Sequence, residues 1–266
     1  MAQSAEHAHA SEGETVVADL SSPQQVQQLI QKIKPDFIVH LAAISFVAHD
    51  DAAEIYKVNQ LGTINLLEAV QKCCPQLEKI LIASSANIYG NAATLPITEE
   101  TPPSPINHYG VSKAAMEMAT SLYGELPIVI CRPFNYTGRG QSSNFLLPKI
   151  VGAYRARKLR IELGNLDVSR DFSDVRDVVA AYLRLLQSGN RMSTYNICSG
   201  TPTSLLAIIE LLNGISGYEI EVSTNPMFAR SEEIKTLYGS PALLESDIGP
   251  YRKYSLHDTL TWMLGE

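Results

Sequence analysis

Lys79-Ile-Leu-Ile-Ala-Ser-Ser85 is the stretch of sequence that decides the fold. Its apolar residues are consecutive rather than alternating, which predicts a strand buried on both faces, as in a parallel sheet that helices cover on each side. Two serines end the run, so hydroxyl groups stand at the carboxyl end of this strand. Because ligands bind at the carboxyl ends of the strands in such sheets, we expect the functional site at that edge.

Strands and helices alternate along the rest of the chain. Further strands are predicted at residues 36–43, 127–134 and 194–198, with a short β-rich run at 15–20. Helices are predicted from Pro23 to about residue 34, and at about 62–73, 109–122, 145–157, 175–187 and 204–213. This order predicts an α/β fold with a doubly wound parallel sheet.

Local signals set some of the helix ends. Ser22 can cap the first helix, with Pro23 in its first turn and Gln25 closing a capping box. Pro35 should stop that helix. Gly214 is expected to be the C-cap of the helix that begins at Ser204.

The composition fits a globular protein and excludes several other classes. Of the 266 residues, 45% are hydrophobic and 18% are charged, which excludes a disordered chain or a coiled coil. The net charge of −7 does not favour a polyphosphate track or an anionic membrane surface, and no apolar run reaches the roughly 18 residues of a membrane span. No signal-peptide pattern is recognised. No metal site is expected, because His7 and His9 have no partner ligands in the sequence around them. Four scattered cysteines suit a reduced, cytoplasmic chain, with Cys198 in the core rather than acting as a nucleophile.

The strongest chemical pattern is Tyr109-Gly-Val-Ser-Lys113, which follows Ser85 by 24 residues at the start of a predicted helix. Residues four apart share one helix face. The ammonium of Lys113 should bring the pKa of the Tyr109 phenol down toward the working range, and Ser85 could hydrogen-bond the same substrate oxygen. The Lys113 ammonium could also hold a ribose hydroxyl of a cofactor. A second match to the spacing, Tyr154 with Lys158, is interpreted as a solvated basic helix end because no polar strand end precedes it.

Six motifs occur in the order seen in the extended short-chain dehydrogenase/reductases, a family of NAD(P)-dependent nucleotide-sugar epimerases, dehydratases and reductases. They are His40-Leu-Ala-Ala43, Asn59 with Gly62-Thr63, Ser84-Ser85 through Tyr89-Gly90, Tyr109 with Lys113, Arg132-Pro-Phe-Asn135 and Arg170-Asp-Phe-Ser-Asp-Val-Arg-Asp177. The resemblance covers about residues 15–266. Within the family, the motifs after residue 135 are most similar to GDP-4-dehydro-6-deoxy-D-mannose reductases.

The resemblance implies a Rossmann-type NAD(P)-binding domain formed by residues 1–137 and 172–200, and a smaller C-terminal α/β substrate domain formed by residues 138–171 and 201–266. The family's opening strand and glycine-rich turn have no counterpart in this sequence, so we expect an N-terminally incomplete sheet and weak cofactor binding. The same segment separates NAD from NADP in the family, so the choice between them stays open. A homodimer through the helices at 62–73 and 109–122 is also implied.

The resemblance further implies roles for individual residues. The catalytic set is Ser85, Tyr109 and Lys113. The cofactor-binding set is Asp19, Leu20, Leu41, Ala42, Ala43, Asn59, Tyr109, Lys113, Pro133 and Phe134. The set that contacts a GDP-linked deoxy-sugar substrate is Ser85, Ala86, Asn87, Asn135, Arg170, Arg230 and Glu233.

Three functions remain open at this stage. The first is NAD(P)H-dependent reduction of the C4 ketone of a GDP-4-dehydro-6-deoxy-hexose. The second is a nucleotide-sugar 4-epimerase or 4,6-dehydratase, although Ala86 and Asn87 stand where dehydratases of the family place acidic residues, and neither can act as a carboxylate base. The third is a non-catalytic sugar-nucleotide-binding protein, which has no physical need for the set Ser85, Tyr109 and Lys113.

Overall fold

The computed structural model describes residues 13–45, 51–228 and 234–265. Its central feature is a four-stranded sheet in the order β1-β2-β3-β7, in which every neighbouring pair is parallel. The strands are β1 (Phe37–His40), β2 (Lys79–Ala83), β3 (Ile128–Pro133) and β7 (Ser193–Ile197). This confirms the parallel α/β sheet that the apolar runs predict.

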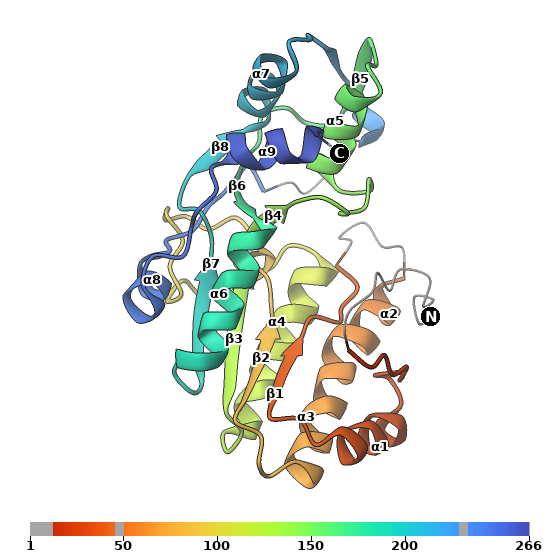
Figure 1. Ribbon diagram of the computed structural model, residues 1–266, viewed down its shortest axis with the longest axis vertical. Coiled ribbons are helices and arrows are strands. Elements are labelled where there is room, and N and C mark those ends of the chain that lie inside the picture. The colour runs from red at the N-terminus through yellow and green to blue at the C-terminus, as the bar shows by residue number, and fades with distance from the viewer. Residues whose placement is uncertain (1–12, 46–50, 229–233, 266) are drawn as a thin grey trace.

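Helices cover both faces of the sheet (Figure 1). Because side chains alternate along a strand, Ile80 and Ile82 of β2 pack toward α1 and α3, while Leu81 between them packs toward α6. The first layer comprises α1 (Pro23–Ile33), α3 (Gly62–Cys73) and α4 (His108–Thr120), and the second comprises α6 (Val175–Ser188) and α8 (Ala242–Ile248). The sheet is therefore doubly wound.

The remaining elements form a second lobe at the carboxyl end of the sheet (Figure 1). It contains α5 (Leu146–Arg155), α7 (Leu205–Ser216), α9 (Leu256–Leu264), the parallel pair β5 (Arg160–Leu163) and β9 (Glu221–Thr224), and a small sheet of β4 (Asn135–Thr137), β6 (Ser169–Asp174), β8 (Pro202–Ser204) and β10 (Thr236–Leu237). Its core is separate from the two cores of the main sheet.

Short helical segments connect these elements. They are α2 (Ala52–Tyr56), the π-helical turn η2 (Lys57–Leu61), and the 3₁₀ turns η3 (Ala86–Tyr89), η4 (Ser121–Tyr123) and η5 (Pro226–Phe228). No helix in the described ranges is long and apolar enough to cross a membrane.

Three local predictions are wrong. Residues 15–20 form no strand. The Ser22 side chain makes no cap hydrogen bond, and the Gln25 side chain accepts from the backbone N–H of Asp19 (3.0 Å) rather than from that of Ser22. Helix α7 continues through Gly214 and ends at Gly217, whose φ of +62° is the left-handed conformation that suits glycine at a helix end.

Strand β1 is less buried than its apolar sequence predicts. Phe37 and Val39 are 44% and 41% exposed. Among the described residues β1 pairs only with β2, so it is an edge strand, and these two side chains alternate with Ile38 and His40, which face the covered side.

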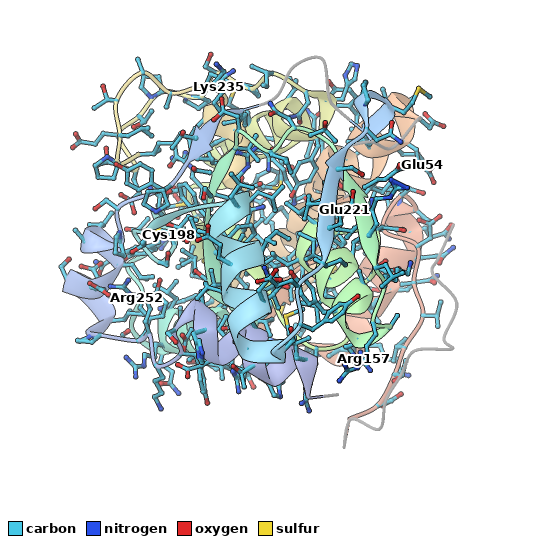
Figure 2. All side chains as sticks on the ribbon, turned by 90° about the horizontal axis from the view of Figure 1, so that it is seen from above. Glu54, Arg157, Cys198, Glu221, Lys235 and Arg252 are labelled. Carbon is cyan, nitrogen blue, oxygen red and sulfur yellow. The ribbon has the colours of Figure 1, made fainter. Side chains whose placement is uncertain are left out.

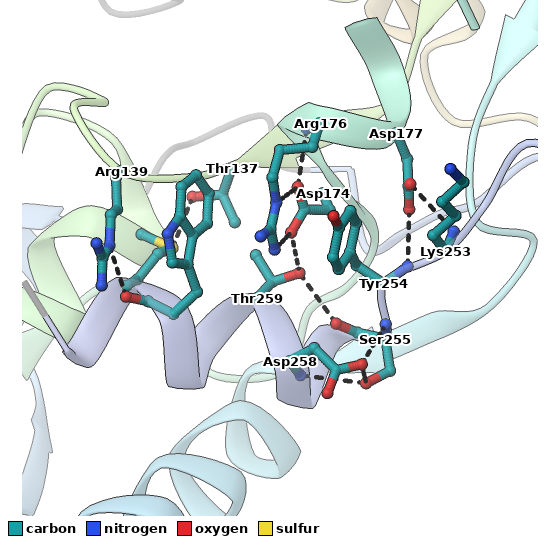
Figure 3. Close-up of polar contacts among 12 residues, drawn as sticks. Thr137, Arg139, Asp174, Arg176, Asp177, Lys253, Tyr254, Ser255, Asp258 and Thr259 are labelled. Carbon is teal, nitrogen blue, oxygen red and sulfur yellow. Dashed lines mark hydrogen bonds and ion pairs between the residues drawn. The ribbon is translucent and has the colours of Figure 1, made fainter. Parts of the chain in front are cut away.

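An arginine joins the start of α6 to α9 (Figure 3). Arg176 binds the Asp174 carboxylate through two nitrogens (2.9 and 2.7 Å), and its guanidinium lies 3.6 Å from the ring centre of Tyr254 and 3.9 Å from that of Trp262. Thr259 of α9 donates to the same carboxylate (2.8 Å). The contacts connect the second lobe to the main sheet's helix layer.

Candidate active site

The turn after β2 fixes the position of Ser85. Its side-chain oxygen accepts hydrogen bonds from the backbone N–H and the side-chain amide of Asn87 (3.1 and 3.2 Å), so Ser85 is the N-cap of η3. Ser85 and Ala86 are buried and Asn87 is half-buried. The predicted serine therefore lies at the carboxyl end of the sheet, where we expect the site.

Helix α4 brings Tyr109 and Lys113 to the same edge. Asn107 caps the helix by accepting from the backbone N–H of Gly110 (2.8 Å). Tyr109, 7% exposed, is close enough to Ser85 for that side chain to affect its ionisation, and Lys113, 3% exposed, donates to the carbonyl oxygen of Ala83 (2.7 Å). The structure thus brings the three predicted catalytic residues together around the end of β2.

The acid–base properties of Tyr109 differ from the prediction. Burial raises the pKa of the Tyr109 phenol to about 12, although the Ser85 side chain opposes that rise. The pKa of the phenol does not fall toward the working range as expected, because loss of hydration disfavours the phenolate and is the largest effect on it. Tyr109 is therefore a protonated phenol at neutral pH, the form in which it can donate a proton.

Burial acts on Lys113 in the opposite sense. It lowers the pKa of the Lys113 ammonium to about 8, and the Glu117 carboxylate one helical turn further on counteracts the shift. Lys113 remains mostly charged at neutral pH.

Asn59 joins the loop after β1 to α4. Its fully buried side chain accepts from the backbone N–H of Ile44 (2.8 Å) and donates to the Ile44 carbonyl and to the Ser112 hydroxyl (3.1 and 3.0 Å). Ser112 lies between Tyr109 and Lys113 in the sequence, so Asn59 holds the loop that contains Leu41, Ala42 and Ala43 against the helix that carries the candidate acid. Leu41 is 57% exposed.

The segment after β3 supplies the next wall. Pro133 and Phe134 are buried, and the Phe134 ring stacks on Tyr89 with 6.3 Å between ring centres. Asn135 follows them at the start of β4 and is exposed. The chain thus changes from core to accessible surface at the residue predicted to contact the sugar.

The other predicted contacts lie elsewhere. The side chain of Asp19 is bonded to Ser21, and Leu20 packs beside Gly62 at the start of α3. Arg170 lies on β6 and donates to the backbone carbonyls of Ser169 and Lys235 (3.0 and 3.1 Å). Arg230 and Glu233 lie outside the described residues.

In the second Tyr–Lys match, Tyr154 is a core residue, whereas the sequence predicts a solvated helix end. Tyr154 is 3% exposed and donates to the side chain of Asn213 (2.6 Å), whereas Lys158 is exposed and lies beyond the end of α5. The two residues therefore share no helix face. Cys198, labelled in Figure 2, is fully buried after β7, and burial raises the pKa of its thiol, as expected for a core cysteine.

Sequence reasoning missed a buried ion pair next to this site. Arg132, on β3, binds the Glu117 carboxylate with a shortest distance of 2.6 Å, and the two side chains are 10% and 9% exposed. The signal was present in the sequence, because Glu117 follows Lys113 by four residues, as Lys113 follows Tyr109.

The edge of the sheet has features that fit a nicotinamide cofactor. The Ser84 hydroxyl, buried at the end of β2, has no hydrogen-bond partner within the described residues. The Lys113 ammonium lies near by, bonded to the preceding residue, Ala83. Small residues, Ala42 and Ala43, follow β1. An unpaired hydroxyl and a cation beside small side chains suit a ribose and its attached ring.

Known proteins resemble this chain over almost its whole length. The family described as GDP-mannose 4,6 dehydratase matches residues 1–263. The chain is 40% identical over 247 residues to a GDP-6-deoxy-D-talose 4-dehydrogenase of Aggregatibacter actinomycetemcomitans, covering 92% of this chain and 84% of the relative. It is 36% identical over 260 residues to a GDP-6-deoxy-D-mannose reductase of Pseudomonas aeruginosa, covering 93% and 85%.

Solved structures also resemble this chain over almost its whole length. The structure of RMD from Pseudomonas aeruginosa complexed with NADPH superposes with a TM-score of 0.86 at 35% identity, covering 94% of this chain and 86% of that one. The family match spans nearly all of this chain, and the Ser85, Tyr109 and Lys113 side chains meet at one edge of a parallel sheet. The protein therefore belongs to the GDP-mannose 4,6 dehydratase family, within the extended short-chain dehydrogenase/reductases.

Proposed function

We propose that this protein is an NAD(P)H-dependent oxidoreductase that reduces the C4 ketone of a GDP-4-dehydro-6-deoxy-hexose, converting GDP-4-dehydro-6-deoxy-D-mannose to GDP-D-rhamnose. The observation that carries the proposal is the buried Tyr109 phenol, protonated at neutral pH and close to the buried Ser85 at the carboxyl end of the sheet. The names of two relatives, a GDP-6-deoxy-sugar 4-dehydrogenase and a GDP-6-deoxy-sugar reductase, support the substrate class.

The chain's own residues divide the chemistry as follows. Ser85 donates a hydrogen bond to the ketone oxygen and orients it. Tyr109 protonates the alkoxide that develops on that oxygen, and the resulting phenolate is stabilised by the charge of Lys113. The loop of Leu41 to Ala43 and the Lys113 ammonium would hold a nicotinamide cofactor, which when bound would supply the hydride for C4.

Reduction is favoured over dehydration because no carboxylate lies at the start of η3. Asn87 donates its side-chain amide to Ser85 (3.2 Å), so it supports the serine and cannot remove a proton from the sugar. Reduction needs no such base.

The domain roles follow from this assignment. Residues 1–137 and 172–200 take the cofactor. Residues 138–171 and 201–266 take the GDP-sugar through Arg170, Arg230 and Glu233, together with Asn135 from the end of the first segment. NADPH and NADH are both candidate reductants, and the complex of a relative with NADPH supports the first.

The assembly and location are also proposals. Val111, Met118 and Leu122 expose 38%, 75% and 82% of their surface along α4 and η4, and Leu61 exposes 51% beside α3, which supports a homodimer through these helices. The four cysteines are free thiols, which supports a cytoplasmic location.

The test is the oxidation of NADPH or NADH, followed by absorbance, with GDP-4-keto-6-deoxymannose as substrate. We expect consumption of the reductant and formation of a GDP-6-deoxyhexose with a C4 hydroxyl. The proposal would be contradicted if neither NADPH nor NADH were oxidised, or if the protein released water from GDP-mannose itself.

A further inference from the structure

A buried carboxylate lies on the same face of α4 as Tyr109 and Lys113. The three residues are spaced by four, so Tyr109, Lys113 and Glu117 are stacked along the side of the helix that faces the sheet. Tyr109 and Lys113 are 7% and 3% exposed, and the Glu117 side chain is 9% exposed. A buried charge without a partner is costly, so the Lys113 ammonium and the Glu117 carboxylate each need a partner.

Arg132 fixes the orientation of Glu117. Its Nε lies 3.1 and 3.2 Å from the two carboxylate oxygens, and one terminal nitrogen lies 2.6 Å from Oε2. The other terminal nitrogen donates to the Tyr89 hydroxyl and to the Glu99 carbonyl (2.8 and 3.1 Å). The guanidinium is thus held on two sides, and the carboxylate cannot rotate away from the sheet.

The strand register places Arg132 close to Lys113. The Lys113 ammonium donates to the Ala83 carbonyl, Ala83 pairs with Cys131 across β2 and β3, and Arg132 is the next residue. Glu117 is therefore ion-paired with Arg132 and lies one helical turn from Lys113 on the same helix face. A lysine that precedes a glutamate by four residues is the weaker order for a helical ion pair, so the helix alone would not hold this contact.

We propose that Glu117 is a positioning residue whose carboxylate, fixed by Arg132 one helical turn from Lys113, supports the charge of the ammonium that donates to the end of β2. The inference rests on the proposed function, because only a protonated Lys113 can stabilise the phenolate that Tyr109 becomes. With burial already lowering the pKa of Lys113 to about 8, loss of the carboxylate would leave the amine largely neutral at the pH where the enzyme works.

Other titratable groups also lie on α4 and on the elements around Lys113. They are His108 and Tyr109 on α4, His40 on β1, Lys79 on β2, Cys131 and Arg132 on β3, Tyr89 on η3, Glu54 and Tyr56 on α2, Lys57 on η2, Glu68, Lys72 and Cys73 on α3, and Tyr123 on η4. Burial holds the pKa of His40 at about 4 and that of Tyr89 at about 12, so both are neutral from pH 6 to 9. Glu117 and Arg132 are the buried charges that can influence Lys113 in this range.

The experiment measures the ionisation of Lys113 directly. In protein labelled with ¹³C-lysine, the Cε resonance of Lys113, assigned by its loss in Lys113→Met, is followed from pH 6 to 10.5. Glu117→Gln should move the midpoint down by about one pH unit or more, and Arg132→Met should move it up, because the Glu117 carboxylate is then no longer neutralised by its ion pair with Arg132. Opposite shifts distinguish an electrostatic role from a general loss of packing.

The controls keep the test decisive. Glu68→Gln removes an exposed carboxylate paired with Lys72 at 3.5 Å and should leave the Lys113 midpoint unchanged. If Glu117→Gln does not fold, Arg132→Met alone decides, since Lys113 still compensates the buried carboxylate in that variant. If both variants fold and both midpoints stay within about 0.3 pH units of the wild type, the inference is overturned. If only Arg132→Met folds, an unchanged midpoint in that variant overturns it.

The same variants separate this inference from the proposed function. The alkaline limb of kcat should follow the NMR midpoint, so that Glu117→Gln loses activity at a lower pH than the wild type. An NMR shift in a protein that does not reduce the GDP-sugar would leave the role of Glu117 intact and refute the reaction.

Discussion

His40, at the end of β1, is buried and neutral. Its Nε2 lies 2.9 Å from the Thr63 hydroxyl, and Thr63 itself donates to the Asn59 carbonyl, so His40 Nε2 is the donor. Burial, with a contribution from the charge of Lys113, lowers the pKa of His40 to about 4 from an ordinary value of 6.5. The unfolded chain therefore binds a proton between pH 6.5 and 4 that the folded chain does not.

This difference makes the stability fall in acid. Between pH 7.5 and pH 5 we expect His40 to remove about 2 kcal/mol from the free energy of unfolding. His40→Gln retains a donor and cannot titrate, so its urea-unfolding curves should lose that part of the dependence. Equal acid sensitivity in the two proteins would show that His40 is not responsible.

Tyr154 provides the contrasting case. Its hydroxyl donates to Asn213 in the core of the second lobe, so Tyr154→Phe leaves a buried acceptor without its donor and should cost about 1 kcal/mol of stability. Turnover by the folded protein should be unchanged, as measured by urea unfolding and by steady-state rates on the same preparation. A large loss of kcat would mean that the wrong Tyr–Lys pair has been assigned to the site.

The contacts that join α6 to α9, those of Arg176 with Asp174, Tyr254 and Trp262, depend on the shape of the guanidinium. Lysine keeps the charge but loses both the two-nitrogen contact with Asp174 and the stacking on Tyr254 and Trp262. Arg176→Lys should therefore lower the free energy of unfolding by about 1–3 kcal/mol. Arg191→Lys, at a half-exposed arginine 3.9 Å from Glu125, is the control and should change it little. A thermal midpoint for Arg176→Lys equal to that of the control would show that the Arg176 contacts do not stabilise the protein.

The long periodic elements could be predicted and the short ones could not. The apolar runs of β2 and β3 and the amphipathic helix α3 are fixed by local sequence, and α3 has the predicted bounds. Strands β4, β8 and β10 have only two or three residues, and β6 contains Arg170, Asp171 and Asp174. Their pairing depends on partners far along the chain, which no local pattern contains.

The site follows the same division. Ser85, Tyr109 and Lys113 could be found because a strand end and a helix start are local signals. The rise in the pKa of Tyr109 could not, because it depends on how deeply the assembled lobes bury the phenol. The role of Arg132 likewise needed the register of β2 against β3.

For the whole molecule, the proposed dimer makes a direct prediction. Met118 and Leu122 are the most exposed apolar side chains of the α4–η4 face, and a charge at each would oppose burial against a second copy. We expect a dimer by light scattering at micromolar concentration and a monomer for Met118→Glu/Leu122→Glu. A monomeric wild type, or a variant that remains dimeric, would exclude this face.

Tyr109 is the proposed proton donor in ketone reduction. Tyr109→Phe keeps the ring and its packing and removes only the hydroxyl. The decisive measurement is kcat for GDP-4-keto-6-deoxymannose with saturating NADPH or NADH, compared between wild type and Tyr109→Phe. General acid catalysis contributes about 10²–10⁴-fold, so we expect a fall of that size with little change in substrate binding. A variant that retains kcat within about threefold of the wild type would contradict the account.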